Sequence, residues 1–497
     1  MSKKVNIRRL ATGVPGLDEI LGGGLPEFSF NLISGPPGSG KTTLAHQIMF
    51  SLASLKGPAL FFTVLGEPPL KMFRYQQQFS FFDLNKIDRS IHFVNLSDEV
   101  STGNFNMMLT RITQEVETTS PALVFVDSFL SVMLDSQHQP KDMISQQQFI
   151  QQLGIQLSYW QATTFLIGEY LPESEPHPLF TVADGLLSLS QNVHRNSMVR
   201  KIQVLKMRGQ AIRPGMHSFR ITDDGIEVFP PALVRDDSGS APKIDRSSRS
   251  RMRLPMGVPH LDDMMGGGLP SGYSLLVAGP SGSGKTILAT AFLEEGMRRN
   301  EPGVFVAFEQ MPSLSWNRTI DNMVCAGKIG LINTRFLDLS IDEIVQNMIK
   351  LIHKMNATRV VIDSLSGFEL AVAPGFREDF RESLFRMVAV LSDIGVTVLM
   401  TSEIEDRYTD LRFSPYGSAF LTDAIIVQRY IEMESHLQRV MSVVKVRASI
   451  HSTEIRRFDI TDDGIVIGDP VLDYEGILSG QPMRAKEFST VGWEQQR

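Results

Sequence analysis

Gly35-Pro36-Pro37-Gly38-Ser39-Gly40-Lys41-Thr42 stands between an apolar run, Phe30–Ser34, and a stretch with helical spacing of apolar residues, Thr43–Lys56. The pattern G-x-x-x-x-G-K-[ST] between a strand and a helix is typical of a P-loop, whose backbone N–H groups converge on phosphates at the start of the helix. In such a loop Lys41 holds the β and γ phosphates, and the Thr42 hydroxyl ligates Mg²⁺. The sequence therefore predicts ATP and Mg²⁺ as cofactors, bound by residues 35–43.

The same stretch occurs a second time, as Gly279-Pro280-Ser281-Gly282-Ser283-Gly284-Lys285-Thr286-Ile287. Two flanking motifs recur at the same spacing: G-V-P-x-L-D at 13–18 and 257–262, and G-G-G-L-P at 22–26 and 266–270. Farther on, I-T-D-D-G-I at 221–226 returns at 460–465 with a small shift. A repeat in register predicts a duplicated domain, with Lys285 and Thr286 in the roles of Lys41 and Thr42.

Each copy alternates apolar runs with stretches long enough for a helix. After the first P-loop these runs are 59–64, 123–126 and 163–167. Continuous apolar strands joined by helical crossovers predict an α/β fold with a mainly parallel sheet flanked by helices. We expect two tandem RecA-like P-loop NTPase domains, 1–234 and 254–469.

The segment between the copies, 235–253, is rich in Ser, Asp and Arg and is predicted to be a solvated linker. Its six basic residues leave a second interpretation open, an arm that contacts nucleic acid. The last stretch, 470–497, loses its periodicity and is predicted to be a tail.

Composition narrows the function classes. The 497 residues are 42% apolar and 21% charged, and 48 Lys and Arg against 55 Asp and Glu leave a net charge of −7. This balance argues against nucleic acid or anionic lipid as a partner of the whole protein. There is one cysteine, Cys325, expected to be a small core residue, and no run of about 18 apolar residues. We therefore expect a cytoplasmic protein without a membrane segment.

An acidic residue is needed to orient the metal. Asp127 ends the apolar run at 123–126, and Asp363 ends the run Val360-Val-Ile in the second copy. With a P-loop upstream, both are predicted to serve the Mg²⁺ site, although an aspartate after a strand also caps a following helix in many proteins.

Hydrolysis needs a group that activates the attacking water, usually a carboxylate at the end of the strand next to the P-loop strand. Glu309 and Gln310 follow the run 304–308 in the second copy, and Gly66 and Glu67 follow the run 59–64 in the first. Glu67 is either a compensating base or a surface carboxylate at the start of a loop.

The chain resembles the KaiC-like circadian clock ATPases of the RecA superfamily in a combination of features. These are the doubled domain, the G-V-P-x-L-D and G-G-G-L-P motifs before each P-loop, the proline in each P-loop, and the Asp-Ser pairs at 127–128 and 363–364. The resemblance covers essentially the whole chain. It implies a two-tiered homo-hexamer in which each nucleotide lies between neighbouring subunits, with protein partners at the C-terminal tail or the ring faces.

The resemblance also implies a strand ending K-x-R that places a Lys and an Arg on the neighbour's γ-phosphate. The matching residues are Lys206 and Arg208 in the first copy and Lys445 and Arg447 in the second. Alternate positions put both side chains on one face of a strand, as such a clamp requires. The other interpretation is a pair of solvated charges on an edge strand.

This chain departs from the family pattern at two places. The family has two adjacent glutamates after the second strand, and in the second domain the first of these glutamates acts as general base. In the second copy of this chain, Glu309 keeps the position of the first glutamate and Gln310 replaces the second. In the N-terminal copy, Gly66 stands in place of the first glutamate. The family's adjacent phosphoacceptors correspond here to Ala419 and Phe420, which have no hydroxyl.

We therefore expect a hexameric ATPase that acts as a nucleotide-dependent switch, without the family's two-site phosphorylation cycle. Two alternatives stay open: a Ser/Thr autokinase that uses Ser418 or Thr422, and a nucleic-acid-binding ATPase.

Overall fold

The structure is a computed structural model that describes residues 7–64, 69–101, 105–127, 152, 156, 159–169, 178–194, 197–232, 252–308, 318–333, 340–371, 380–404, 421–433, 435–472, 474–477 and 483–484. The chain divides into two compact units, Met1–Pro231 and Ala232–Arg497.

The first unit is built around one sheet with the strand order β11-β10-β9-β8-β3-β7-β6-β4-β5. The strands from β8 to β5 in this order run parallel to their neighbours, and β8, β9, β10 and β11 pair antiparallel. Its strands are β3 (Phe30–Ser34), β4 (Ala59–Thr63), β5 (Ile91–Asn95), β6 (Leu123–Asp127), β7 (Thr163–Gly168), β8 (Gly185–His194), β9 (Ser197–Met207), β10 (Met216–Thr222) and β11 (Gly225–Phe229), with a separate pair, β1 (Arg9–Leu10) and β2 (Leu25–Pro26).

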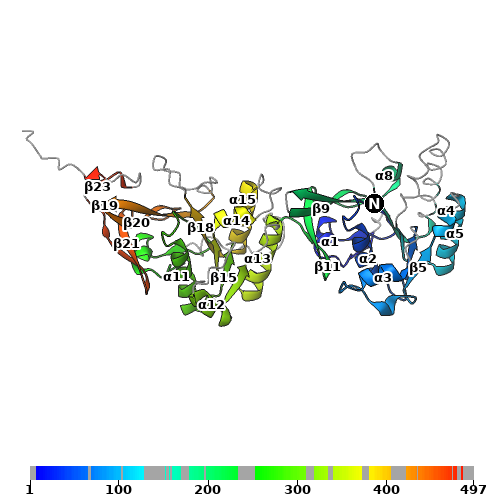
Figure 1. The fold of residues 1–497 in the computed structure, drawn as a ribbon, viewed down its shortest axis with the longest axis horizontal. Coiled ribbons are helices and arrows are strands. Elements are labelled where there is room, and N and C mark those ends of the chain that lie inside the picture. Colours follow the sequence, from blue (N-terminus) through cyan, green and yellow to red (C-terminus); the bar gives the residue numbers. More distant parts are fainter. Residues whose placement is uncertain are drawn as a thin grey trace, which may run out of the picture. The chain divides into compact units, whose positions relative to one another are not determined.

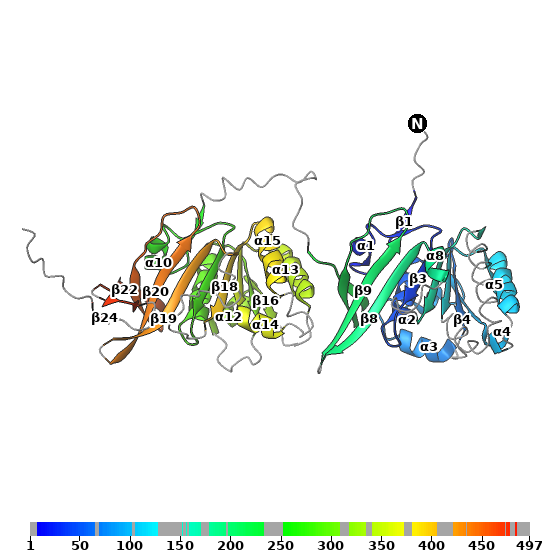
Figure 2. The same cartoon turned by 90° about the horizontal axis from the view of Figure 1, so that it is seen from above.

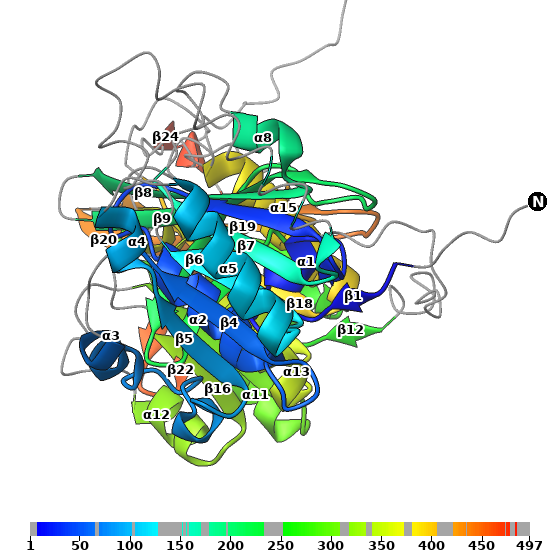
Figure 3. The ribbon, with the colours of Figure 1, turned by 90° about the vertical axis from the view of Figure 1, so that its right-hand side faces the viewer.

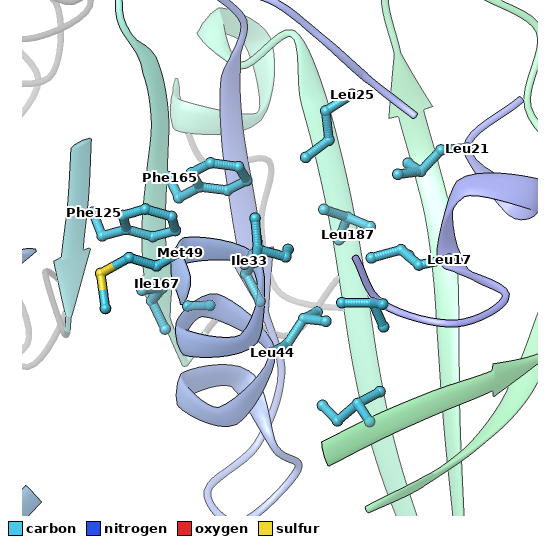
Figure 4. Close-up of a cluster of buried hydrophobic side chains, with 14 of the residues drawn as sticks. Leu17, Leu21, Leu25, Ile33, Leu44, Met49, Phe125, Phe165, Ile167 and Leu187 are labelled. Carbon is cyan, nitrogen blue, oxygen red and sulfur yellow. The ribbon is translucent and has the colours of Figure 1, made fainter. Parts of the chain in front are cut away.

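Helices cover both faces of this sheet, because its strands are apolar on both sides. One apolar cluster joins the sheet to α1 and α2, and a second joins the opposite face to α5. Figure 4 shows Leu44 and Met49 of α2 beside Ile33, Phe125 and Ile167 of the strands. The parallel strands can be followed in Figure 3. The helices are α1 (Leu17–Ile20), α2 (Lys41–Leu52), α3 (Pro69–Gln76), η1 (Leu84–Lys86), α4 (Ser97–Ser101), α5 (Phe105–Thr119) and α8 (Pro178–Val182).

The second unit repeats this sheet in the order β16-β15-β17-β18-β14-β19-β20-β21-β22. Figure 2 shows the long hairpins β8–β9 and β19–β20 that the two units have in common. Its strands are β14 (Ser274–Gly279), β15 (Gly303–Ala307), β16 (Ile329–Asn333), β17 (Arg359–Asp363), β18 (Thr397–Glu403), β19 (Ala424–Met433), β20 (His436–Val446), β21 (Ile455–Thr461) and β22 (Gly464–Pro470), with the pairs β12 (Arg253–Leu254) and β13 (Leu269–Pro270), and β23 (Tyr474–Glu475) and β24 (Met483–Arg484).

Two apolar clusters again lie on opposite faces of the sheet, one with α10, α11 and α12 and the other with α13, α14 and α15. Figure 1 shows α11 and α12 below these strands and α14 and α15 above them. The prediction of two tandem P-loop domains with mainly parallel, helix-covered sheets is confirmed. The helices are α10 (Pro259–Met264), α11 (Lys285–Arg298), α12 (Arg318–Cys325), α13 (Ile341–Met355), α14 (Leu365–Ala371) and α15 (Phe380–Ile394).

Two local predictions were wrong. The helix expected over 43–56 ends at Leu52, because Ala53 is extended and Ser54 and Gly57 exchange backbone hydrogen bonds of 3.0 and 3.1 Å in a tight turn. Cys325 is exposed rather than in the core, because it ends α12 on the side away from the buried Ile320 and Met323.

Ordered structure extends past the predicted end of the second domain. The Val471 N–H donates to the Ile455 carbonyl at 2.8 Å, and Val471 and Ile477 pack with Ile431 of β19. At the other boundary, Arg253 lies in β12 and donates to the Met265 and Gly268 carbonyls at 2.9 and 2.8 Å. Of the six basic linker residues, only Arg253 lies within the described ranges, and its guanidinium is bound to the protein's own backbone.

The described helices include none that combines the length and the apolar character needed to cross a membrane.

A buried histidine makes the stability of the first unit depend on pH. The His46 ring lies in α2, 4.6 Å from the Phe61 ring between centroids, and is 1% exposed. Burial lowers the pKa of His46 to about 4, and a contact with Gln76 offsets this only in part. The unfolded chain, with a histidine pKa near 6.5, therefore takes up a proton at a higher pH than the folded chain does.

We expect the free energy of unfolding of the first unit to fall by about 2 kcal/mol between pH 7 and pH 5 from this group. His46→Phe, which keeps a ring in this aromatic environment, should remove that part of the pH dependence. Burial also lowers the pKa of His217, so a smaller dependence of the same sign should remain. Chemical denaturation followed at both pH values measures this, and an unchanged pH dependence in His46→Phe contradicts it.

Candidate functional site

Both predicted phosphate loops join a buried strand to a helix. The loop after β3 leads into α2 at Lys41, and the loop after β14 leads into α11 at Lys285. The last loop glycines, Gly40 and Gly284, both have φ 100°. A Cβ atom at either glycine would lie 2.9 Å from an isoleucine Cδ1, that of Ile221 or Ile460. The positive φ is what favours glycine at both positions, since the isoleucine side-chain ends could move aside.

The helix starts leave backbone donors available. The N-cap residues are Gly40 and Gly284, which have no side chain that could accept from the first N–H groups of the helix. Neither helix has an acidic residue in its first turn. The loop tips, Pro37–Gly38 and Ser281–Gly282, are exposed. A helix N-terminus with uncapped N–H groups and an exposed glycine-rich approach suits an anion such as phosphate.

The two loop lysines fold back onto their own loops. The Lys41 ammonium donates to the Gly35 and Pro36 carbonyls at 2.8 and 2.9 Å, and the Lys285 ammonium donates to the Gly279 and Pro280 carbonyls at 2.9 and 2.7 Å. Burial lowers the pKa of both lysines. Nearby carboxylates partly raise it: Glu169 and Asp127 for Lys41, and Glu403 and Asp363 for Lys285. Each loop thus holds a cation at the strand end where phosphates would bind.

Each predicted metal-binding pair is brought together. The Thr42 hydroxyl donates to Asp127 Oδ2 at 2.6 Å, and the Thr286 hydroxyl donates to Asp363 Oδ2 at 2.7 Å. In the ranges that the structure describes, no group of three or more His, Cys, Asp or Glu side chains could hold a metal. A hydroxyl with one carboxylate fits Mg²⁺, which prefers oxygen ligands and keeps positions for water and phosphate oxygens.

The predicted water-activating residues, Gly66, Glu67, Glu309 and Gln310, lie outside the described residues. Their strands, β4 and β15, were expected next to the P-loop strands, and this was wrong. In the first sheet β7 and β6 lie between the P-loop strand β3 and β4, and in the second sheet β18 and β17 lie between the P-loop strand β14 and β15. The crossover connections later in the chain place these strands there.

One of the two strands next to each P-loop strand, β7 or β18, leads to a carboxylate that the sequence interpretation missed. Glu169 follows β7 directly, and Glu403 ends β18 opposite Gly279. Both side chains are exposed at the same edge as the P-loop. The signal was present in the sequence, because an apolar run ends in a glutamate at the corresponding place of both copies.

The two loops differ in what supports them. The Ser283 hydroxyl donates to Gln428 Oε1 at 3.1 Å, and Gln428 lies in β19 beside the loop. The corresponding β8 residue is Leu189, which has no polar side chain, and the buried Ser39 hydroxyl has no hydrogen-bond partner among the described residues.

The four K-x-R residues lie far from the P-loop of their own unit. Met207 pairs with Gly185, and Gly185 lies beside Asn31 near the start of β3, whereas the loop follows the end of that strand. The interval from Asn31 to Gly35 is roughly 13 Å at about 3.3 Å per residue. Val446 has the same relation to Ala424 and Leu275 in the second unit.

At that opposite edge these cations bind local backbone and carboxylate oxygens. Lys206 donates to the Phe180 and Thr181 carbonyls at 3.1 and 3.2 Å, and Lys445 donates to the Thr422 carbonyl at 2.6 Å. Arg208 and Arg447 form ion pairs of 3.1 and 3.7 Å, with Asp184 and Asp423 respectively. The arginine side chains are 58% and 73% exposed, so both can be reached from outside the unit.

Of the candidate phosphoacceptors, Ser418 lies outside the described residues, as do Ala419 and Phe420. Thr422 is 2% exposed and lies just before β19, at the same edge as Lys445.

The chain is similar to known proteins over nearly its whole length. The family model described as "ATPase: KaiC" matches residues 10–232 and 254–471. The chain is 28% identical over 497 residues to the circadian clock oscillator protein KaiC of Picosynechococcus sp. (strain ATCC 27264 / PCC 7002 / PR-6), covering 96% of this chain and 93% of that protein. It is also 28% identical over 498 residues to the circadian clock oscillator protein KaiC 1 of Synechocystis sp. (strain ATCC 27184 / PCC 6803 / Kazusa), covering 96% and 92%.

Proposed function

The chain belongs to the KaiC family of ATPases, and on that premise we propose that it binds and hydrolyses Mg-ATP at subunit interfaces of a homo-hexameric ring. The ring acts in the cytoplasm as a nucleotide-dependent switch for protein partners, which bind at the ring faces or the C-terminal tail. Nucleic acid is not a partner in this proposal, because the net charge is −7.

Each site has a division of roles among the residues of one chain. The loops 35–43 and 279–287 bind the phosphates, Lys41 and Lys285 neutralise their charge, and the pairs Thr42–Asp127 and Thr286–Asp363 hold Mg²⁺. In these pairs the carboxylate and hydroxyl oxygens would hold the metal, which would supply positive charge against the negative charge that develops during hydrolysis. Glu309 orients water at the second site, where the first site has only Glu67 beside Gly66.

The observation that carries the proposal is the position of the K-x-R residues. Lys206, Arg208, Lys445 and Arg447 lie at the sheet edge opposite the P-loop of their own unit, so within that unit they do not reach the phosphates. A Lys and an Arg repeated in both units at an exposed edge fit a site completed by the next subunit, where they stabilise the γ-phosphate.

We expect ATP to be required for ring closure, because each nucleotide then bridges two chains. Mass measurement should find six chains in saturating Mg-ATP and smaller species without nucleotide. Arg208→Ala with Arg447→Ala should raise the ATP concentration needed for assembly by about tenfold or more, the worth of a lost charge-assisted hydrogen bond.

The matched control is Arg298→Ala, which removes another exposed arginine, from the last turn of α11. It should assemble as the unmodified chain does. A monomer in saturating Mg-ATP would contradict the proposed interface. Assembly of the double variant and of the unmodified chain at the same ATP concentration would contradict it too.

A further inference from the structure

The carboxylate of the second metal pair is held from two sides. Asp363 accepts from the Thr286 hydroxyl on Oδ2 at 2.7 Å, and it accepts from the Thr401 hydroxyl on Oδ1. Thr286 comes from α11, and Thr401 comes from β18, the strand between β17 and the P-loop strand. The two oxygens of one carboxylate are therefore bound by two different elements.

The first unit has a different residue at the place of Thr401. In the first sheet, Leu123 at the start of β6 lies opposite Thr163 at the start of β7. In the second sheet, Arg359 at the start of β17 lies opposite Thr397 at the start of β18. The two strand pairs therefore have the same register. Counting on from these pairs, Asp127 lies opposite Ile167 and Asp363 lies opposite Thr401. Isoleucine has no hydroxyl, so β7 cannot donate this hydrogen bond.

The added hydrogen bond restricts the carboxylate. Thr401 is fully buried and Asp363 is 9% exposed, so water competes little for the bond. A β-branched threonine in a strand has restricted χ1 freedom, which keeps its donor in place. With Oδ1 held by Thr401, the carboxylate keeps the orientation in which Oδ2 lies beside the Thr286 hydroxyl. Partners of this kind orient metal-binding carboxylates and affect metal affinity strongly.

We propose that Thr401 is a positioning residue for Mg²⁺ at the second site, acting through Asp363. The inference rests on the proposed function, because it takes Thr286–Asp363 and Thr42–Asp127 as the Mg²⁺ sites. It adds a residue whose effect on the metal does not depend on the water-activating glutamates.

The test measures metal binding in the full chain. Lys41→Ala reduces phosphate binding at the first loop, so Mn²⁺ binding with ADP, followed by electron paramagnetic resonance and by competition with Mg²⁺, then reports the second site. In this background Thr401→Val should weaken the metal affinity about tenfold, the lower end of the range for such partners. Thr401→Ser, which restores a hydroxyl, should recover most of the affinity.

The matched control is Thr397→Val in the same strand. Thr397 is also fully buried, and its hydroxyl accepts from the Gly272 N–H at 2.8 Å, away from the metal pair. Thr397→Val should lower stability without changing metal affinity.

Equal metal affinity in Thr401→Val and Thr397→Val would overturn the inference, and so would a failure of Thr401→Ser to recover affinity. Both results leave the proposed function standing if the Lys41→Ala chain still binds metal with ADP. A Lys41→Ala chain that binds no metal with ADP would instead overturn the proposed function, and this inference with it.

Discussion

Replacing Lys285 with alanine in a chain that already carries Lys41→Ala is expected to lower ATP turnover by about a hundredfold or more. The Lys285 ammonium is held within 2.9 Å of two loop carbonyls at the strand end, so it meets bound phosphates without a large rearrangement. Removing a fixed charge that stabilises a developing negative charge typically costs a factor of this size. A steady-state assay of phosphate release measures the change.

The single variants test how the two sites share the turnover. Lys285→Ala alone should remove a larger fraction than Lys41→Ala alone, because the proposed water-activating Glu309 is retained in the second copy while Gly66 stands at the matching place of the first. Lys354→Ala, at an exposed position in the last turn of α13, is the control and should leave turnover unchanged. A larger loss in Lys41→Ala would show that Glu67 or Glu169 activates water at the first site.

Much of this architecture could be predicted because the P-loop pattern is local. Gly40 and Gly284 are required by a positive φ, and the apolar runs before Asp127 and Asp363 are strands that end at the predicted residues. Such features depend on a few consecutive residues, so their spacing along the chain indicates their geometry. The duplication then allowed each feature to be checked against its second copy.

Features that depend on strand order could not be predicted in the same way. Periodicity identifies β4 and β15 as strands but does not say that two strands separate each from the P-loop strand. Thr401 and Glu403 become relevant only once β18 is known to lie between β14 and β17. Sheet order is set by packing of whole crossovers, which leaves no mark in a short stretch of sequence.

A buried arginine in the second unit has no counterpart in the first. Arg359 begins β17 and is fully buried, where the first unit has Leu123 at the matching place of β6. Its guanidinium donates to Glu301 at 2.8 Å and to the Pro255 and Phe292 carbonyls at 2.8 and 2.9 Å. A Cβ at Gly296 would lie 2.7 Å from Arg359 Cδ, so a glycine there provides the space.

Arg359→Met is therefore expected to destabilise the second unit by about 3 to 5 kcal/mol, because it leaves the Glu301 carboxylate and two carbonyls without their donor. The double variant Arg359→Met with Glu301→Met should lose less than the sum of the two single variants, since it removes the unpaired charge as well. Hydrogen exchange of β17 and α11 in the full chain locates the loss, and Leu123→Met in β6 is the matched control, expected to cost less than about 1.5 kcal/mol. Unchanged hydrogen exchange in β17 of Arg359→Met would contradict this prediction. It would mean that the hydrogen bonds of Arg359 stabilise the unit no more than an apolar side chain of similar length does.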